Sequence, residues 1–366
     1  MRVPIDVRGN LIYLRGKVDN SDSLWIVLDS GSSSTAMNDS RARALGLRVT
    51  GTSHAEGSGG SAVGGTIRSA TLRLPGLTLD SEPIGTLPLD SLGSRSGRPM
   101  DVILGYPLLS RCAVRIDYAE RTLTLYRADR FKYSGGGTVL PLTFRNGLPY
   151  VTARVTLPGQ QPIEGQFVID TGSGQAVILA ASFVRERRVL ETVAHTIQGR
   201  GHGVGGESQS QVARLERLEL GGLALKQPIA ALRTSAAGRI AAEGAIGNLG
   251  GEILHRFTVT FDYPRKRMIL EPNARSGEPF EADMSGLGLR MRPHAFQVEW
   301  IQPGSPAAEA GIQPDDMIES VDGKPADELG MPAVRELFRR AAETHQLVIR
   351  RGDQRTEVSL TTRRMI

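Results

Sequence analysis

The sequence has little cysteine, few aromatic residues and no long apolar run, and these shortages narrow the class of protein. Cys112 is the only cysteine, so no disulfide within the chain can hold the fold. No apolar run reaches the roughly 20 residues of a membrane-spanning helix, so we expect no membrane span. Aromatic residues make up 5% and the net charge is +5, which disfavours a nucleic-acid groove. The six histidines lack metal-binding spacing, and we expect neither a metal nor a cofactor.

Glycine and proline, in contrast, are abundant, at 43 and 20 residues. This composition favours many short strands joined by turns over bundles of helices. The strongest pattern is an internal repeat, in which an apolar strand delivers an Asp into a Gly turn at residues 25–32 and again at 167–173. Residues 104–118 also align without a gap with residues 249–263, and the blocks recur in the same order.

The internal repeat, and a different sequence pattern in the residues that follow it, divide the chain into three predicted domains. Residues 1–132 and 138–275 are interpreted as two copies of one β-rich unit, joined by a Gly-rich linker. Residues 280–366 are predicted to form a separate domain that contains both strands and a helix.

Helices are expected to be few and short. One should follow each Asp turn, the first capped by Asn38 and the second by Ser182, because hydroxyl and amide side chains favour that position. In the third domain, apolar residues at helical spacing predict a helix from about residue 331 to 343.

The two Asp turns carry the candidate chemistry. If the two copies pack about a pseudo-twofold axis, Asp29 and Asp170 meet at that axis. Two carboxyls about 3 Å apart cannot both ionise cheaply, so they share one proton. One can then act as general base on a water molecule while the other protonates a substrate carbonyl. Peptide hydrolysis would need no metal and no covalent intermediate.

The neighbours of the two Asp residues fit this role. Gly31 and Gly172 permit a tight turn and a close backbone approach. The hydroxyls of Ser30 and Thr171 can bond across the interface and stiffen the pair. The alternative is that Asp-x-Gly is simply a turn, but its recurrence at one place in a repeat favours catalysis.

These motifs resemble those of retropepsin-type aspartic peptidases, including bacterial members with two such domains and a C-terminal PDZ domain. The resemblance rests on residues 28–32 and 169–173, and on apolar-apolar-Gly motifs at 103–105 and 245–247. The gapless alignment instead places residues 248–250 opposite 103–105, which leaves the second motif open. The resemblance implies a mainly β protein, with two retropepsin-like β-barrel lobes in a pepsin-like bilobal body.

It also implies two flaps over a substrate cleft, near residues 57–65 and 199–206. The residues expected to contact substrate are Gly60, Val63, Gly203 and Val204.

The third domain resembles a bacterial PDZ domain, which would bind a C-terminal peptide as an added strand. Its carboxylate-binding loop is expected at Gly286, Leu287, Gly288 and Leu289. The alternative is that this domain binds nothing.

The sequence therefore predicts an aspartic endopeptidase that acts on peptides or proteins, with the third domain recruiting or gating substrate. The alternative is a peptide-binding protein on the same scaffold without catalysis. The short linker favours a monomer in which the lobes form an intramolecular pseudo-dimer. No export signal follows Met1. A periplasmic or secreted location is nevertheless expected from the likeness to PDZ domains of exported proteases, with the cytoplasm as the alternative.

Overall fold

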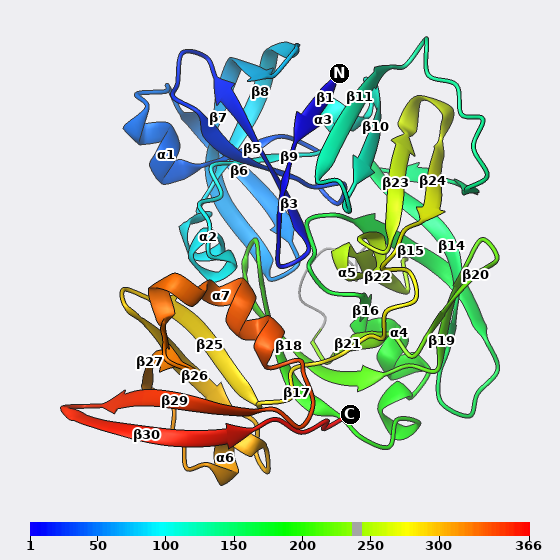
Figure 1. Ribbon diagram of the computed structural model, residues 1–366. Coiled ribbons are helices and arrows are strands. Elements are labelled where there is room, and N and C mark those ends of the chain that lie inside the picture. The colour runs from blue at the N-terminus through cyan, green and yellow to red at the C-terminus, as the bar shows by residue number, and fades with distance from the viewer. Residues whose placement is uncertain (236–243) are drawn as a thin grey trace. The chain divides into compact units, whose positions relative to one another are not determined.

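The computed structural model describes residues 1–235 and 244–366, and strands dominate it, as predicted (Figure 1). The chain divides into two compact units. The larger unit contains residues 1–90, 100–194 and 199–279, and the smaller contains residues 91–99, 195–198 and 280–366. No helix among the described residues is both long and apolar enough to cross a membrane.

The first lobe of the larger unit is built on an eight-stranded sheet. In sheet order its strands are β2 (Asp6–Arg8), β3 (Leu11–Val18), β4 (Leu24–Leu28), β9 (Val102–Leu104), β5 (Ala36–Asn38), β8 (Leu77–Leu87), β7 (Gly60–Leu74) and β6 (Thr50–Gly57). Strand β4 is apolar and almost wholly buried, and β3 and β9 pair with it on its two edges. It runs parallel to β9 and ends directly before Asp29.

The second lobe repeats this design in a ten-stranded sheet. In order its strands are β17 (Ile197–Gly203), β18 (Gly206–Arg214), β21 (Ile229–Arg233), β16 (Val177–Leu179), β22 (Gly247–Gly250), β15 (Ile163–Asp170), β14 (Leu148–Thr156), β19 (Arg217–Leu220) and β20 (Leu223–Lys226), with β13 (Thr143–Arg145) paired to β14. Here β15 ends on Asp170 and runs parallel to β22, as β4 does to β9.

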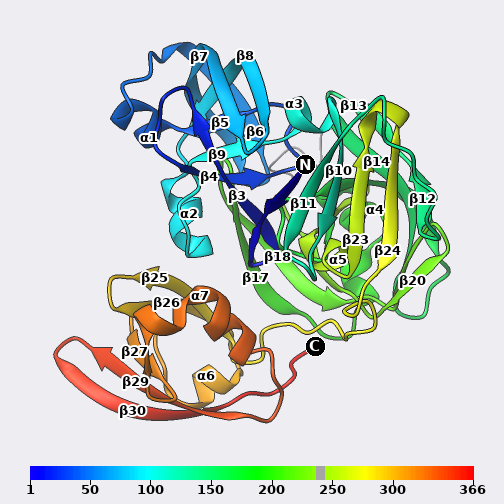
Figure 2. The ribbon, with the colours of Figure 1, turned by 45° about the horizontal axis from the view of Figure 1, so that its top comes forward.

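A third sheet joins the two lobes edge to edge (Figure 2). Its order is β1 (Arg2–Pro4), β11 (Thr122–Arg127), β10 (Cys112–Asp117), β23 (Phe257–Asp262), β24 (Arg267–Pro272) and β12 (Thr138–Pro141). The junction is the antiparallel pair β10–β23, in which Val114 faces Phe261 and Ile116 faces Val259. All four side chains are fully buried, so the sheet fixes the lobes through both hydrogen bonds and apolar packing.

Short helices fill the turns of the larger unit: α1 (Asp39–Ala44), α3 (Tyr106–Leu109), α4 (Ala181–Glu186), α5 (Gly251–Leu254), and the 3-10 turns η1 (Val189–Glu191) and η3 (Tyr263–Arg265). The predicted cap of α1 is confirmed, because the Asn38 side chain accepts from the Ser40 N–H. The predicted Ser182 cap is wrong. Helix α4 already begins at Ala181, and its N-cap residue is Ala180, which makes no side-chain hydrogen bond. The Ala180 N–H donates to Ile246 O, and this bond holds Ala180 in an extended conformation before the helix begins.

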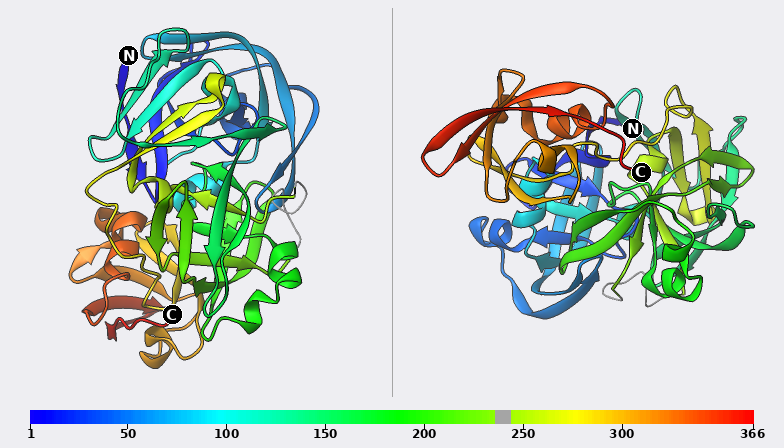
Figure 3. Two further views of the ribbon diagram at one scale, coloured as in Figure 1. Left: turned by 90° about the vertical axis from the view of Figure 1, so that its right-hand side faces the viewer. Right: turned by 90° about the horizontal axis from the view of Figure 1, so that it is seen from below.

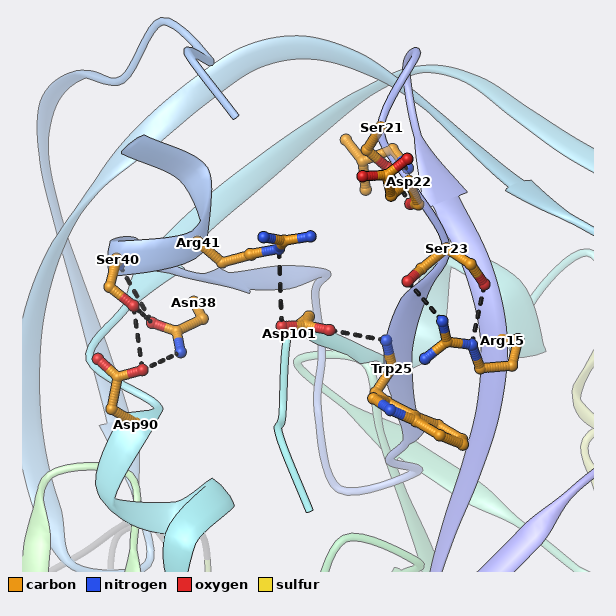
Figure 4. Close-up of polar contacts among 11 residues, drawn as sticks. Arg15, Ser21, Asp22, Ser23, Trp25, Asn38, Ser40, Arg41, Asp90 and Asp101 are labelled. Carbon is orange, nitrogen blue, oxygen red and sulfur yellow. Dashed lines mark hydrogen bonds and ion pairs between the residues drawn. The ribbon is translucent and has the colours of Figure 1, made fainter. Parts of the chain in front are cut away.

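A polar network fixes the start of β9 beside β4 in the first lobe (Figure 4). The Asp101 carboxyl accepts from the Trp25 N–H at 2.8 Å, and its backbone N–H donates to Trp25 O at 3.0 Å. The other Asp101 oxygen lies 4.0 Å from Arg41 Nε. Close by, Asn38 donates to Asp90 at 2.7 Å. Paired charges and amides thus set the register of the strand that supports Asp29.

The smaller unit has its own sheet (Figure 3). Its buried apolar side chains form a core of their own. The sheet order is β25 (Leu287–Arg292), β26 (Ala295–Ile301), β27 (Met317–Val321), β29 (Thr344–Arg351) and β30 (Gln354–Thr361), with β28 (Lys324–Pro325) beside β27. Its helices are α2 (Asp90–Ser96), α6 (Pro306–Glu309) and α7 (Ala326–Leu337). Within this unit, Arg95 binds both oxygens of Glu299 at 2.6 and 3.0 Å.

The helix predicted at residues 331–343 is only partly present. Helix α7 begins at Ala326, is broken at Gly330, where φ is 69° and ψ 162°, and ends at Leu337. Pro332 explains the break, because proline lacks the N–H of a continuous helix. The apolar face of α7 packs Met331 and Val334 against the core. The residues beyond Leu337 lie outside the helix and lead to β29.

Candidate active site

Asp29 and Asp170 occupy equivalent positions at the ends of β4 and β15. Both carboxyls are half-buried. The Gly31 N–H donates to Asp29 Oδ1 at 2.8 Å, and the Gly172 N–H donates to Asp170 Oδ1 at 2.8 Å. Each turn therefore holds its own carboxyl in the same orientation by the same backbone bond.

The two turns face each other across the lobe interface. A Cβ atom on Gly31 would lie 2.6 Å from Asp170 Cγ, and one on Gly172 would lie 2.4 Å from Asp29 Cγ. Each carboxyl thus rests on the glycine of the opposite turn, where any side chain would collide with it. The structure brings the four residues together as one cluster.

Ser30 and Thr171 bind the turns to each other through four buried hydrogen bonds, which we call the grip. The Thr171 hydroxyl accepts from the Ser30 N–H at 2.9 Å and donates to Leu28 O at 2.8 Å. In the reverse direction, the Ser30 hydroxyl accepts from the Thr171 N–H at 3.0 Å and donates to Ile169 O at 2.8 Å. Each hydroxyl satisfies one donor and one acceptor of the other lobe, so the pair is rigid.

An aromatic cluster adjoins the two carboxyls. Tyr263 packs against Phe144, with ring centroids 4.7 Å apart, and against Tyr106 at 6.1 Å. Burial raises the pKa of Tyr263 well above its usual value, and the charges of Asp29 and Asp170 raise it further. The phenol therefore stays neutral and contributes low-dielectric surroundings to the site. In the gapless alignment of residues 104–118 with 249–263, Tyr263 is the counterpart of Tyr118, which was the only sequence signal for this residue.

Of the two candidate positions for the second motif, the strand register selects residues 248–250, Asn-Leu-Gly, over residues 245–247. In the parallel strand pairs, Leu28 faces Leu104 and Ile169 faces Leu249, which makes Gly250 the counterpart of Gly105. Asn248 consequently takes the place that Ile103 has in the first lobe. Its side chain is 3% exposed and donates from Nδ2 to Asp170 Oδ2 at 2.6 Å. Sequence reasoning overlooked this contact, although the gapless alignment pointed to the position.

The predicted flaps are hairpins of β6 with β7 and of β17 with β18. Their tips meet, since the Gly59 N–H donates to Val204 O at 3.0 Å. Arg233 also donates to Ser58 O across the two lobes. Of the residues expected to contact substrate, Gly60, Gly203 and Val204 lie at these tips, whereas Val63 lies further along β7 with 58% of its surface exposed.

The predicted peptide-binding loop of the third domain begins at Gly286, whose φ of 79° suits glycine. The Gly286 N–H donates to Asp283 Oδ1 at 2.7 Å, and the Leu287 N–H donates to Ser285 Oγ at 3.1 Å. Leu287 and Leu289 are buried in the core, and Gly288 lies against the Trp300 ring. A peptide carboxylate would have to displace Asp283 and Ser285 from these two amides.

No cluster of three or more His, Cys, Asp or Glu that could hold a metal occurs within residues 1–235 and 244–366. The site as described consists of carboxyl, hydroxyl and amide groups.

Two family models agree with this organisation. An aspartyl protease family model matches residues 14–108 and 151–251, and a PDZ domain model matches residues 297–351. A crystal structure of an aspartic proteinase from Irpex lacteus covers 76% of this chain and 98% of its own, with a TM-score of 0.47 and 15% identity. A probable CtpA-like serine protease of Staphylococcus haemolyticus (strain JCSC1435) is 27% identical over 172 residues. That match covers 46% of this chain, which spans about a third (32%) of the relative's length.

Proposed function

Because this chain belongs to the aspartyl protease family, we propose that it is an aspartic endopeptidase whose catalytic pair is Asp29 and Asp170. One observation carries the proposal. Two carboxyls from repeat-related turns rest on each other's glycines and are locked in place by the grip of Ser30 and Thr171.

The proposed reaction uses a water molecule between the two carboxyls. The ionised Asp removes a proton from this water, and the water oxygen attacks the peptide carbonyl carbon. The protonated Asp gives its proton to the carbonyl oxygen, which yields a neutral tetrahedral diol. The first Asp then passes its proton to the amide nitrogen as the C–N bond breaks. One diol hydroxyl returns a proton to the second Asp, so the pair regains its single proton.

The remaining parts of the chain support peptide binding. Glycine-rich flap tips would close over an extended substrate, and the third domain would recruit or position a chain terminus. Both the inter-lobe sheet and the grip are formed within one chain, which supports a monomer that carries an intramolecular pseudo-dimer.

The test is digestion of a peptide library, with products read by mass spectrometry from acid to neutral pH. Wild type is compared with Asp29→Asn and Asp170→Asn, and with Asp22→Asn as an exposed control. We expect losses of at least about 10²-fold in the two site variants and no change in the control. Cleavage that persists in either site variant would refute the proposal.

Two outcomes would identify other functions. Rapid inactivation by a serine-directed fluorophosphonate would indicate the serine chemistry named for the Staphylococcus haemolyticus relative. A wild-type chain that binds library peptides but cleaves none at any pH would be a peptide-binding protein on a peptidase scaffold.

A further inference from the structure

The two halves of the site differ at one strand position. Ile103 on β9 faces Val27, and Asn248 on β22 faces Val168. Ile103 lies two residues before Gly105, which is level with the Asp29 turn. Asn248 lies two residues before Gly250, which is level with the Asp170 turn. Since side chains alternate along a strand, Asn248 lies on the same sheet face as Asp170. Both side chains are buried, at 6% and 3% exposure, yet only Asn248 carries a hydrogen-bond donor.

Asn248 gives Asp170 a second amide bond. Asp170 Oδ1 accepts from the Gly172 N–H at 2.8 Å, and Oδ2 accepts from Asn248 Nδ2 at 2.6 Å. Asp29 Oδ1 has the equivalent backbone bond from Gly31 at 2.8 Å. The side chain at the position equivalent to Asn248 is the hydrocarbon of Ile103, which can donate nothing to Asp29.

A donor bonded to a carboxyl stabilises its ionised form. The effect is larger for a buried donor, because few water dipoles compete in a low-dielectric interior. Asn248 Oδ1 has no partner among the described residues, so the amide is committed to Asp170 through its NH₂ group. The reverse orientation would set two acceptors against each other unless Asp170 carried the proton.

We propose that Asn248 is a positioning residue that assigns the shared proton, leaving Asp170 ionised as the base and Asp29 protonated as the acid. The inference rests on the proposed function and deepens it. In the first step Asp170 takes a proton from water, whose oxygen bonds to the carbonyl carbon, while Asp29 gives its proton to the carbonyl oxygen. Tyr263, beside both carboxyls, has a raised pKa, so its phenol stays neutral and takes no part in this exchange.

Chemical labelling of the full-length protein reads the proton directly. An ionised carboxylate opens an epoxide by attacking a ring carbon, and the alkoxide formed takes a proton from water. A protonated carboxyl instead transfers its proton to a diazoacetyl ester, which loses N₂ and leaves an ester on the oxygen. Peptide mapping by mass spectrometry then identifies the labelled residue. We expect the epoxide on Asp170 and the diazo label on Asp29, each with a preference of about tenfold or more.

Three variants form a matched set around the two equivalent positions. Asn248→Ile gives both halves isoleucine and should bring the ratio of epoxide labelling on Asp170 to that on Asp29 close to one. Ile103→Asn gives both halves the donor and should do the same without removing a contact, which covers the case that Asn248→Ile fails to fold. The exchange Ile103→Asn with Asn248→Ile should reverse the preference. An epoxide on Asp29 in wild type, or a preference that no variant changes, would overturn the inference.

The pH profile of kcat/KM supplies an independent readout. Removing the donor means that the base ionises only at higher pH, so Asn248→Ile should move the acid limb upward by about one pH unit, with KM little changed. An unmoved limb with altered KM would indicate a merely structural Asn248. Failure of the proposed function is separable, because labelling needs no substrate. A chain that labels as expected but cleaves nothing would retain the proton assignment and lose the peptidase role.

Discussion

Replacing Thr171 with valine tests whether the grip holds the lobes together. Valine keeps the shape of threonine but removes the hydroxyl, which takes the acceptor from the buried Ser30 N–H and one donor from Leu28 O. A buried donor left without its partner costs about 1–3 kcal/mol, so Thr171→Val should lower the free energy of unfolding by about that amount. Thr171→Ser retains the hydroxyl and should cost clearly less.

Thr35 provides a matched control for this substitution. It is 1% exposed, as deeply buried as Thr171, but its hydroxyl has no hydrogen-bond partner among the described residues. Thr35→Val therefore removes an unpaired polar atom and should be neutral or stabilising by up to about 2 kcal/mol.

Urea unfolding followed by circular dichroism and by tryptophan fluorescence, to which Trp25 on β4 and Trp300 on β26 contribute, measures both effects. Comparable m values would show that the same surface unfolds in each variant. If Thr171→Val and Thr35→Val differed by less than about 0.5 kcal/mol, the hydrogen bonds of the grip would contribute no net stability and the reasoning would be wrong.

Three further changes test other parts of the chain. Gly59→Ala places a Cβ 2.1 Å from Gly206 O, so the flap tips must separate; KM for a cleaved peptide should rise several-fold with kcat less affected. Burial alone would raise the pKa of Asp316, but hydrogen bonds from Arg351 and a backbone N–H outweigh it and hold the pKa below its ordinary value. The stability it adds is present above the unfolded pKa near 3.8 and is lost as pH falls through the folded pKa, so urea melts of Asp316→Asn should show destabilisation at pH 7 that shrinks as pH falls below about 3.8. Arg256→Met removes the donors to four backbone carbonyls and should expose residues 273–279 to limited proteolysis, whereas unchanged cleavage would show that the arginine does not hold this segment.

The sequence predicted the larger pattern of the fold because that pattern is local and duplicated. An apolar strand followed by Asp-(Ser/Thr)-Gly is readable in each copy, and the repeat makes Asp29 and Asp170 equivalent without any knowledge of contacts. The gapless alignment also agreed with the strand register that equates Gly105 with Gly250. The short apolar-apolar-Gly motif at 245–247 left a second candidate open, because three residues carry less information than the register of whole strands that decides between them.

Features that depend on contacts between distant segments could not be read in this way. The bond between Asn248 and Asp170 joins residues 78 apart, and a polar residue inside an apolar motif gives no hint of its partner. The meeting of the flap tips likewise depends on both lobes being folded. Errors at the helices arose from single positions. Ala180 is held extended by the hydrogen bond from its N–H to Ile246 O. Helix α7 is broken at Gly330, and the spacing of its apolar residues predicts only the half after this break.

The inter-lobe sheet gives the protein a freedom that a dimer of identical subunits lacks. In a symmetric homodimer every position is present twice, so a donor placed beside one carboxyl is also placed beside the other, and the proton has no preferred side. Here β10 and β23 join two halves of one chain, and each half keeps its own residue at the shared position. Isoleucine and asparagine can therefore differ across the axis, and the degeneracy of the two carboxyls is lifted before any substrate arrives.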